Sequence, residues 1–61
     1  MKFEDLVKVI DAYTKIELYE FNGEKLLFTG AIKDLKNHPD RVMSIVPQKT
    51  SREVYLEIKV Y

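Results

Sequence analysis

The run Val54-Tyr55-Leu56-Glu57-Ile58-Lys59-Val60-Tyr61 is the clearest structural signal in the chain, because aliphatic residues alternate in it with charged or aromatic ones. An alternation with a period of two places every second side chain on the same face of a β-strand. The pattern therefore predicts a strand with an aliphatic face on the hydrophobic core and a second face that carries tyrosine, glutamate and lysine. The other segments must supply its partners and the cover for its aliphatic face.

A β-hairpin is predicted upstream of this strand. Ile16–Phe21 is rich in β-branched and aromatic residues and is followed by Asn22-Gly23. Asn-Gly between two strand-like segments is typical of a type I′ turn, since both of its central residues need a positive φ. The return strand is expected from Lys25 to Thr29 and can continue to Ile32. Gly30 inside it indicates a bulge or a close approach of the backbone.

The remaining segments predict one helix, one turn and one more strand. Apolar residues recur every three or four positions near the N-terminus, which predicts an amphipathic helix of about three turns, with its stripe at Phe3, Leu6, Val7, Ile10 and Tyr13. Residues 33–40 are polar and predict a single helical turn followed by a loop. A strand is expected from Arg41 to Val46, with Pro47 ending it and residues 48–51 forming a loop.

These elements predict a single α+β domain over residues 1–61. Its expected architecture is a four-stranded, mostly antiparallel sheet made of two hairpins, with the N-terminal helix packed on one face. Six aliphatic residues are expected to form most of the covered face: Ile16, Leu18, Val54, Leu56, Ile58 and Val60.

The small size of the chain favours self-association. A domain of 61 residues buries only about 60% of the surface that its unfolded chain exposes, so its stability is marginal. Domains of this size are often reinforced by disulfides, a metal or a second subunit. The chain has no cysteine and one histidine, which argues against a disulfide and against a typical zinc site. We therefore expect a homodimer without a cofactor.

The charge balance and the hydropathy pattern limit the classes of partner and compartment. Ten basic residues offset ten acidic ones, whereas a nucleic-acid-binding protein usually has a basic excess. No apolar run approaches the roughly 20 residues that a membrane-spanning helix needs. Glu4 and Asp5 are unlike the basic start of a secretory leader. With the absence of cysteine, these features predict a cytoplasmic protein that does not enter a membrane.

The residue types that support catalysis do not form a complete set. His38-Pro39-Asp40 is similar to the tripeptide with which J-domain co-chaperones stimulate their chaperone partners, but there two antiparallel helices present it, and here a strand pattern follows. An ordinary loop fixed by Pro39 is the simpler interpretation. His38 could pair with Asp34 or Asp40 as a general base or metal ligand, but further ligands are lacking.

Neither the hydroxyl, the glycine nor the glutamate residues change this conclusion. Ser44 and Ser51 are not in a nucleophile-elbow motif, and the two glycines are isolated rather than part of a phosphate-binding loop. The glutamates could suggest paired catalytic carboxylates, but lysines are interleaved with them, which favours cross-strand ion pairs on a solvent-facing surface. We expect that the protein is not an enzyme.

Aromatic residues indicate where a partner could bind. Tyr19, Phe21, Tyr55 and Tyr61 share the strand parity of the charged residues, so they are predicted on the sheet face away from the helix, and Leu27 is expected to join them. Aromatic residues among mixed charges are typical of a protein interface with a polar rim. Two alternatives remain open: rings that simply cover the sheet, and rings that stack nucleic-acid bases. Nearby glutamates oppose the second alternative.

Several segments also carry a resemblance to known sequences. They are Thr14-Lys15-Ile16-Glu17-Leu18-Tyr19, Asn22-Gly23, Gly30-Ala31-Ile32-Lys33-Asp34-Leu35, Val42-Met43-Ser44-Ile45 and Leu56-Glu57-Ile58-Lys59-Val60. In this layout the chain resembles short proteins encoded by phages, prophages and mobile elements of Firmicutes. The resemblance implies a protein of the host-cell cytoplasm that binds a host protein, such as an inhibitor of a bacterial defence system. A nucleic-acid-binding module that uses the same sheet face is the alternative.

Overall fold

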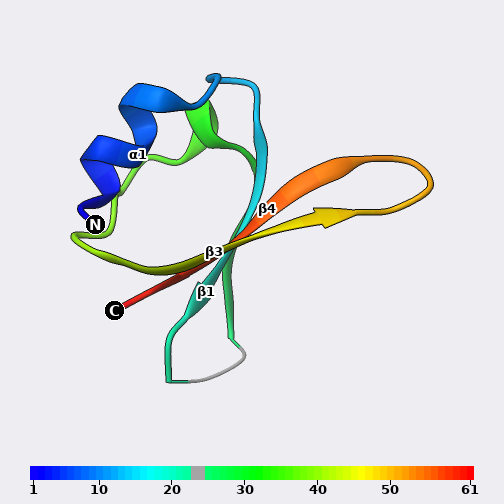
Figure 1. Cartoon of the computed structure of the whole chain (residues 1–61). Helices are drawn as coiled ribbons and strands as arrows, with labels where there is room; N and C mark the ends of the chain where they lie inside the picture. The colour runs from blue at the N-terminus through cyan, green and yellow to red at the C-terminus, as the bar shows by residue number, and fades with distance from the viewer. Residues whose placement is uncertain (23–24) are drawn as a thin grey trace.

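The structure is a computed structural model that describes residues 1–22 and 25–61 (Figure 1). In these ranges one α-helix precedes a pair of strands, a short 3-10 helix and a second pair of strands. In chain order they are α1 (Phe3–Val9), β1 (Lys15–Glu20), β2 (Leu26–Ala31), the 3-10 helix η1 (Ile32–Asp34), β3 (Val42–Lys49) and β4 (Val54–Val60). Within the described ranges, neither helix has the length and apolar character needed to cross a membrane.

The four strands form one mixed sheet in the order β2-β1-β4-β3. β1 and β2 form one antiparallel hairpin, and β3 and β4 form the other. The hairpins join through β1 and β4, which run parallel in the centre of the sheet, with Ile16 beside Leu56 and Leu18 beside Ile58. The structure therefore confirms the predicted α+β fold with two hairpins, and it adds a parallel central pair.

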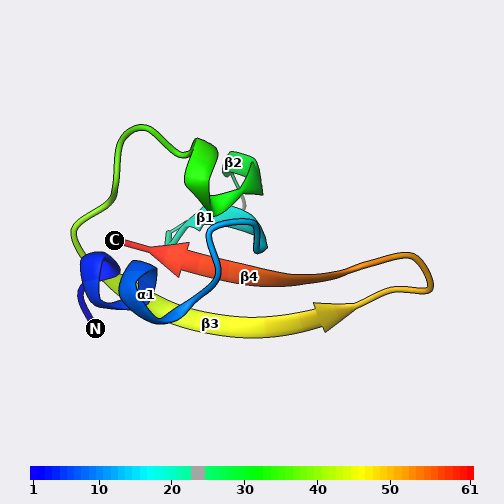
Figure 2. The same cartoon turned by 90° about the horizontal axis from the view of Figure 1, so that it is seen from above.

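The hydrophobic core lies between the sheet and the two helical elements. α1 contributes Phe3 and Leu6, and η1 contributes Ile32. The strands contribute the remaining buried residues, Ile16, Leu18, Val42, Ile58 and Val60. Figure 2 shows α1 over one end of β3 and β4, while the far end of this hairpin extends beyond the helix. Only part of one sheet face is therefore covered.

Two features of this region differ from the sequence-based expectations. The helix ends at Val9 rather than near Tyr13, because the β-branched Val9 and Ile10 disfavour helix and an Asp11 side chain accepts a hydrogen bond from the Tyr13 N–H at 2.7 Å, which forms a turn instead. The expected burial of Val54 is also wrong. Its side chain is 64% exposed because it lies on the uncovered end of the hairpin.

The prediction that Pro47 ends the third strand is wrong as well. β3 continues through it to Lys49 and so takes in two residues of the expected loop. Proline is tolerated there because β3 is an edge strand, whose outer side needs no hydrogen-bond donor. The sequence alone did not indicate which strands would lie at the edges.

The β1–β2 hairpin has one irregularity close to its turn. The register shifts between Leu18 and Tyr19, so that Leu18 pairs with Phe28 but Tyr19 pairs with Leu26. The expected type I′ turn at Asn22-Gly23 includes Gly23, which lies outside the described residues. Gly30 has a φ of +140°, and a Cβ added there would lie 3.4 Å from Cζ of Phe28. This distance is an ordinary van der Waals contact with a side chain, so the positive φ favours glycine here and not a close approach of the backbone. The bulge lies nearer the turn.

Candidate interaction surface

The sheet face opposite the core is the candidate site, and we call it the open face. The buried residues of α1 and η1 all belong to the core on the other side of the sheet. Strand pairing defines which side chains share the open face, because residues directly opposite one another point to the same side. From β2 to β3 it comprises Leu26, Thr29 and Ala31, then Lys15, Glu17 and Tyr19, then Tyr55, Glu57 and Lys59, then Ser44, Val46 and Gln48.

Four of the five predicted site residues fall on this face or at its end. Tyr19 lies beside Lys59 in the parallel pair, and Tyr55 lies two positions before Glu57 on the same strand. Phe21 and Tyr61 follow directly after their strands, and their ring centroids are 5.2 Å apart with an interplanar angle of 50°. Phe21 is 40% exposed and Tyr61 is 69% exposed. The aromatic side chains thus run along the two central strands.

The fifth predicted residue, Leu27, is placed elsewhere. It lines a pocket together with Leu18 and Phe28, on the side of the sheet that carries the core. The register shift next to Tyr19 causes this change, because it brings Leu26 rather than Leu27 opposite the tyrosine. Leu26 is 45% exposed, so it supplies the aliphatic contact that the sequence assigned to Leu27. Two successive leucines gave no signal that could separate these roles.

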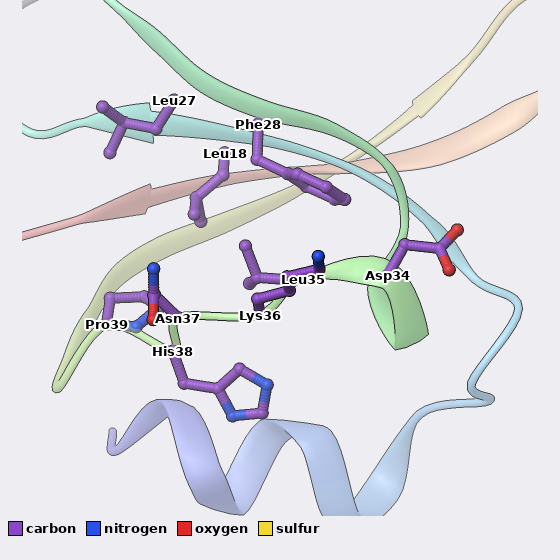
Figure 3. A pocket seen from close by; sticks show the side chains of 9 residues that line it. All are labelled: Leu18, Leu27, Phe28, Asp34, Leu35, Lys36, Asn37, His38 and Pro39. Atoms are coloured by element: carbon purple, nitrogen blue, oxygen red, sulfur yellow. The ribbon is translucent and has the colours of Figure 1, made fainter.

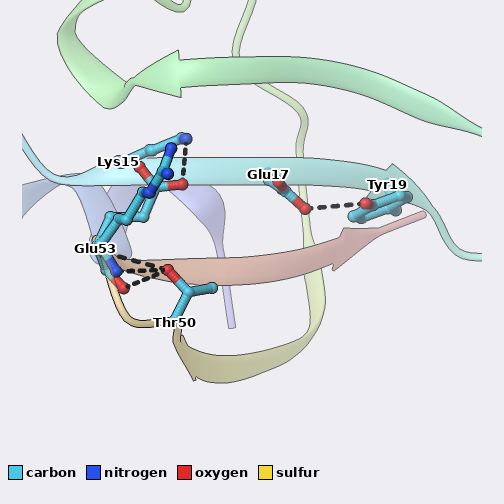
Figure 4. A network of polar contacts seen from close by, with 6 residues as sticks. Lys15, Glu17, Tyr19, Thr50 and Glu53 are labelled. Carbon is cyan, nitrogen blue, oxygen red and sulfur yellow. Dashed lines mark hydrogen bonds and ion pairs between the residues drawn. The ribbon is translucent and has the colours of Figure 1, made fainter.

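One end of the open face is organised by Lys15 (Figure 4). Its Nζ atom forms an ion pair with Glu53 Oε1 at 2.7 Å and lies 5.8 Å from the centroid of the Tyr55 ring. The hydrogen bond to Glu53 raises the pKa of Lys15, against a smaller opposing effect of desolvation. Glu53 is itself held by a tight turn, in which Thr50 Oγ1 accepts the Glu53 N–H at 3.1 Å. The ammonium group is therefore fixed beside an aromatic ring.

The centre of the open face holds two carboxylates. Glu17 and Glu57 are direct neighbours in the parallel pair. The Tyr19 hydroxyl donates to Glu17 at 2.9 Å (Figure 4), and Gln48 Nε2 donates to Glu57 at 3.2 Å. The hydrogen bond to Glu17 is the largest cause of a raised pKa of Tyr19. Neutral donors rather than lysines thus satisfy these two glutamates, whereas the expected cross-strand ion pairing is found at Lys15 and Glu53.

The loop that contains His38-Pro39-Asp40 has a structural role on the opposite side of the sheet. His38 Nδ1 lies 3.2 Å from Glu4 Oε1, and its ring centroid is 5.3 Å from that of Phe3. The Phe3 N–H also donates to the Asp40 carbonyl at 3.0 Å. These contacts fasten the loop to the start of α1. Among the described residues, the polar side-chain partner of His38 is Glu4 rather than Asp34 or Asp40, so the structure does not assemble the His–Asp pairs considered from the sequence.

The same loop lines one side of a pocket of about 530 Å³ (Figure 3). Leu18 and Phe28 from the sheet form one wall, and Leu35 faces them from the loop side. The polar residues Asp34, Lys36, Asn37 and His38 also line it. Across the described residues, no three histidine, aspartate or glutamate side chains come together as metal ligands would.

Comparisons of the chain with protein-family models, with curated proteins and with solved structures found no match.

Proposed function

We propose that this chain is a non-enzymatic protein-binding module whose docking surface is the open face. One observation supports the proposal above the others: four aromatic residues lie along β1 and β4 or directly after them on the face without a helix, within a frame of lysine, glutamate and glutamine. Tyr19 and Tyr55 are half-buried, and Phe21 and Tyr61 are exposed. Tyrosine is enriched at protein interfaces because it combines a large apolar ring with a polar hydroxyl.

The dimensions of the domain agree with a protein partner. The domain extends 30 and 25 Å along its two longest axes, so the rectangle that bounds its widest side measures about 750 Å². A standard protein–protein interface buries roughly 800 Å² on each partner. A partner of ordinary affinity would therefore cover most of the open face, including both the Tyr19 region and the Phe21–Tyr61 pair.

The charges of the open face favour a protein over a nucleic acid. Lys15 is paired with Glu53. Glu17 and Glu57 lie side by side in the sheet, between Lys15 on β1 and Lys59 on β4. Nucleic-acid affinity depends on cations that replace the counterions of the phosphates. A face with at least as many carboxylates as ammonium groups does not provide that attraction. Base stacking on Tyr19 and Tyr55 stays the alternative proposal.

The resemblance to phage and mobile-element proteins supports a bacterial host protein as the partner, for example an effector of a defence system. In that case the chain acts by covering a surface that the host protein needs. The mechanism requires shape, contact and charge pairing, and it requires no chemical step by the chain itself.

A capture experiment with matched variants tests the proposal. The tagged chain, a Tyr19→Ser/Tyr55→Ser variant and a Val9→Ser control would each be incubated with a Firmicutes lysate treated with nuclease. Val9 is 77% exposed and lies on α1, away from the open face. Each retained protein would be identified by mass spectrometry and its affinity measured by calorimetry.

We expect a protein that the parent and Val9→Ser retain equally and that the double variant loses. An interfacial hot-spot residue contributes at least about 2 kcal/mol, or roughly 30-fold in affinity. Equal affinity of the double variant would contradict the proposal. Capture that depends on intact nucleic acid, weakening steeply as salt increases, would favour the alternative.

A further inference from the structure

The helical side of the sheet carries a pocket that plays no part in the proposed function. It lies between the first two strands and the loop of residues 34–39, and its volume is about 530 Å³. Small-molecule sites in proteins commonly measure roughly 300–1,000 Å³ and combine apolar walls with a few polar groups. The residues that line this pocket indicate which class of small molecule it can hold.

The walls of the pocket are mainly apolar, and the core covers them only in part. Leu18 is 3% exposed, whereas Leu27 is 46% exposed. Phe28 and Leu35 pack against the core but stay half-buried. Figure 3 shows Leu35 facing Leu18 and Phe28 across the pocket. An apolar body inserted between these side chains removes their remaining exposed surface from water, which favours its binding.

The loop on the other side of the pocket is held at both of its ends. At its start, the Leu35 N–H donates to the Ile32 carbonyl at 3.1 Å, and the Ile32 N–H donates to the Thr14 carbonyl at 2.9 Å. At its end, the Phe3 N–H donates to the Asp40 carbonyl at 3.0 Å. The pocket is therefore formed before a ligand arrives, and binding does not have to order the loop.

The charges around the pocket favour a ligand with an anionic end. Asp34, Lys36 and His38 are the titratable residues that line it. The Asp34 carboxylate is paired with Lys33, whose Nζ lies 3.1 Å from Oδ1. The His38 ring contacts Glu4 at 3.2 Å and is directed towards α1 (Figure 3). Among the described residues, the Lys36 ammonium is the lining charge that no ion pair balances, so it attracts an anion.

We propose that this pocket binds a small monocarboxylic acid with an apolar body. The body lies between Phe28 and Leu35, and the carboxylate accepts hydrogen bonds from the Lys36 ammonium and from the neighbouring Asn37 amide. A single ammonium group balances one negative charge. A phosphate ester fits less well, because it carries about 1.5 to 2 negative charges at neutral pH. The site lies on the opposite side of the sheet from the open face, so it does not depend on the proposed function.

NMR titrations of the isotopically labelled chain with three matched probes test the site. 4-Phenylbutyrate, 4-phenylbutan-1-ol and 4-phenylbutylamine share an apolar body and end in an anionic, a neutral and a cationic group. From usual ligand efficiencies, we expect 4-phenylbutyrate to bind with a Kd of about 1–3 mM or tighter and to shift the amide resonances of Phe28, Leu35 and Asn37. It should bind roughly 3- to 10-fold more tightly than the alcohol, because charge-assisted hydrogen bonds are the stronger ones, and the amine should bind most weakly.

Variants at exposed positions separate the two parts of the site. Lys36→Gln should lower the affinity for the acid to that for the alcohol and leave the alcohol unaffected, whereas Leu27→Ser should weaken both. Lys49→Gln, at the far end of the β3–β4 hairpin, is the matched control and should change neither. Circular dichroism would confirm that each variant is folded. Three results would overturn the proposal: no saturable shifts at the pocket up to about 10 mM probe, equal affinities for acid and alcohol, or a preference for the acid that survives Lys36→Gln.

Discussion

The same substitution at two valines of β4 should have very different effects on stability. Val54 and Val60 lie on the same strand with the same parity, but Val54 is 64% exposed and Val60 is 2% exposed. Valine and threonine are both β-branched, so the exchange preserves strand propensity. At Val60 the new hydroxyl is placed in the core beside Phe3 and Leu6. A buried hydroxyl without a partner costs about 1–3 kcal/mol.

Val60→Thr should therefore lower the free energy of unfolding by about 1–3 kcal/mol, and Val54→Thr should change it by less than about 0.5 kcal/mol. With a urea m-value of about 1 kcal/mol/M for so small a chain, the unfolding midpoints should differ by roughly 1–3 M. Far-ultraviolet circular dichroism in dilute solution measures both. Equal midpoints for the two variants would refute the account of which part of the sheet is covered, and with it the assignment of the open face.

Three further predictions concern particular contacts. In a double-mutant cycle with alanine, Phe21 and Tyr61 should show a coupling of about 0.5–1.5 kcal/mol from their tilted rings, and no coupling would contradict the contact. Gly30→Ala should destabilise the fold by about 1–3 kcal/mol in urea unfolding, because alanine rarely adopts a φ of +140°; a change below about 0.5 kcal/mol would argue against that conformation. Glu17→Val should return the raised pKa of Tyr19 towards its ordinary value of 10.0 in NMR titrations of labelled tyrosine rings. Because the folded chain holds the Tyr19 proton more tightly, the hydrogen bond to Glu17 stabilises the fold below pH 10, and this stabilisation is lost as pH rises through the folded-state pKa. Identical titrations of Tyr19 in the parent and the variant would contradict the hydrogen bond.

Side-chain periodicity was sufficient to predict the fold class but not the arrangement of the strands. The alternation at Val54–Val60 and the pattern around Ile16 and Leu18 identified the two strands that meet in the centre of the sheet. Periodicity gives the face of a side chain, however, and says nothing about how far a helix reaches across that face. Val54 and Val60 are equivalent in the pattern and opposite in burial.

The candidate surface, like the fold, was predictable only in part from the alternation of side chains. The alternation of side chains along β1 and β4 was enough to place Tyr19 and Tyr55 on the open face, because the two strands pair in a regular register. Leu27 was misplaced because a one-residue register shift reverses which of two neighbours faces a given side. The contact of Gln48 with Glu57 and the placement of β2 and β3 at the edges of the sheet depend on the pairing of strands in three dimensions, and no local sequence signal reports them.

Chemical-shift mapping of the isotopically labelled chain with its captured partner tests the central claim most directly. If the open face is the docking surface, amide resonances should change along β1 and β4, above all at Tyr19, Tyr55 and Tyr61, while those of α1 stay in place. Changes concentrated instead on α1 and on the loop around His38 would contradict it, because the partner would then occupy the helical side of the sheet.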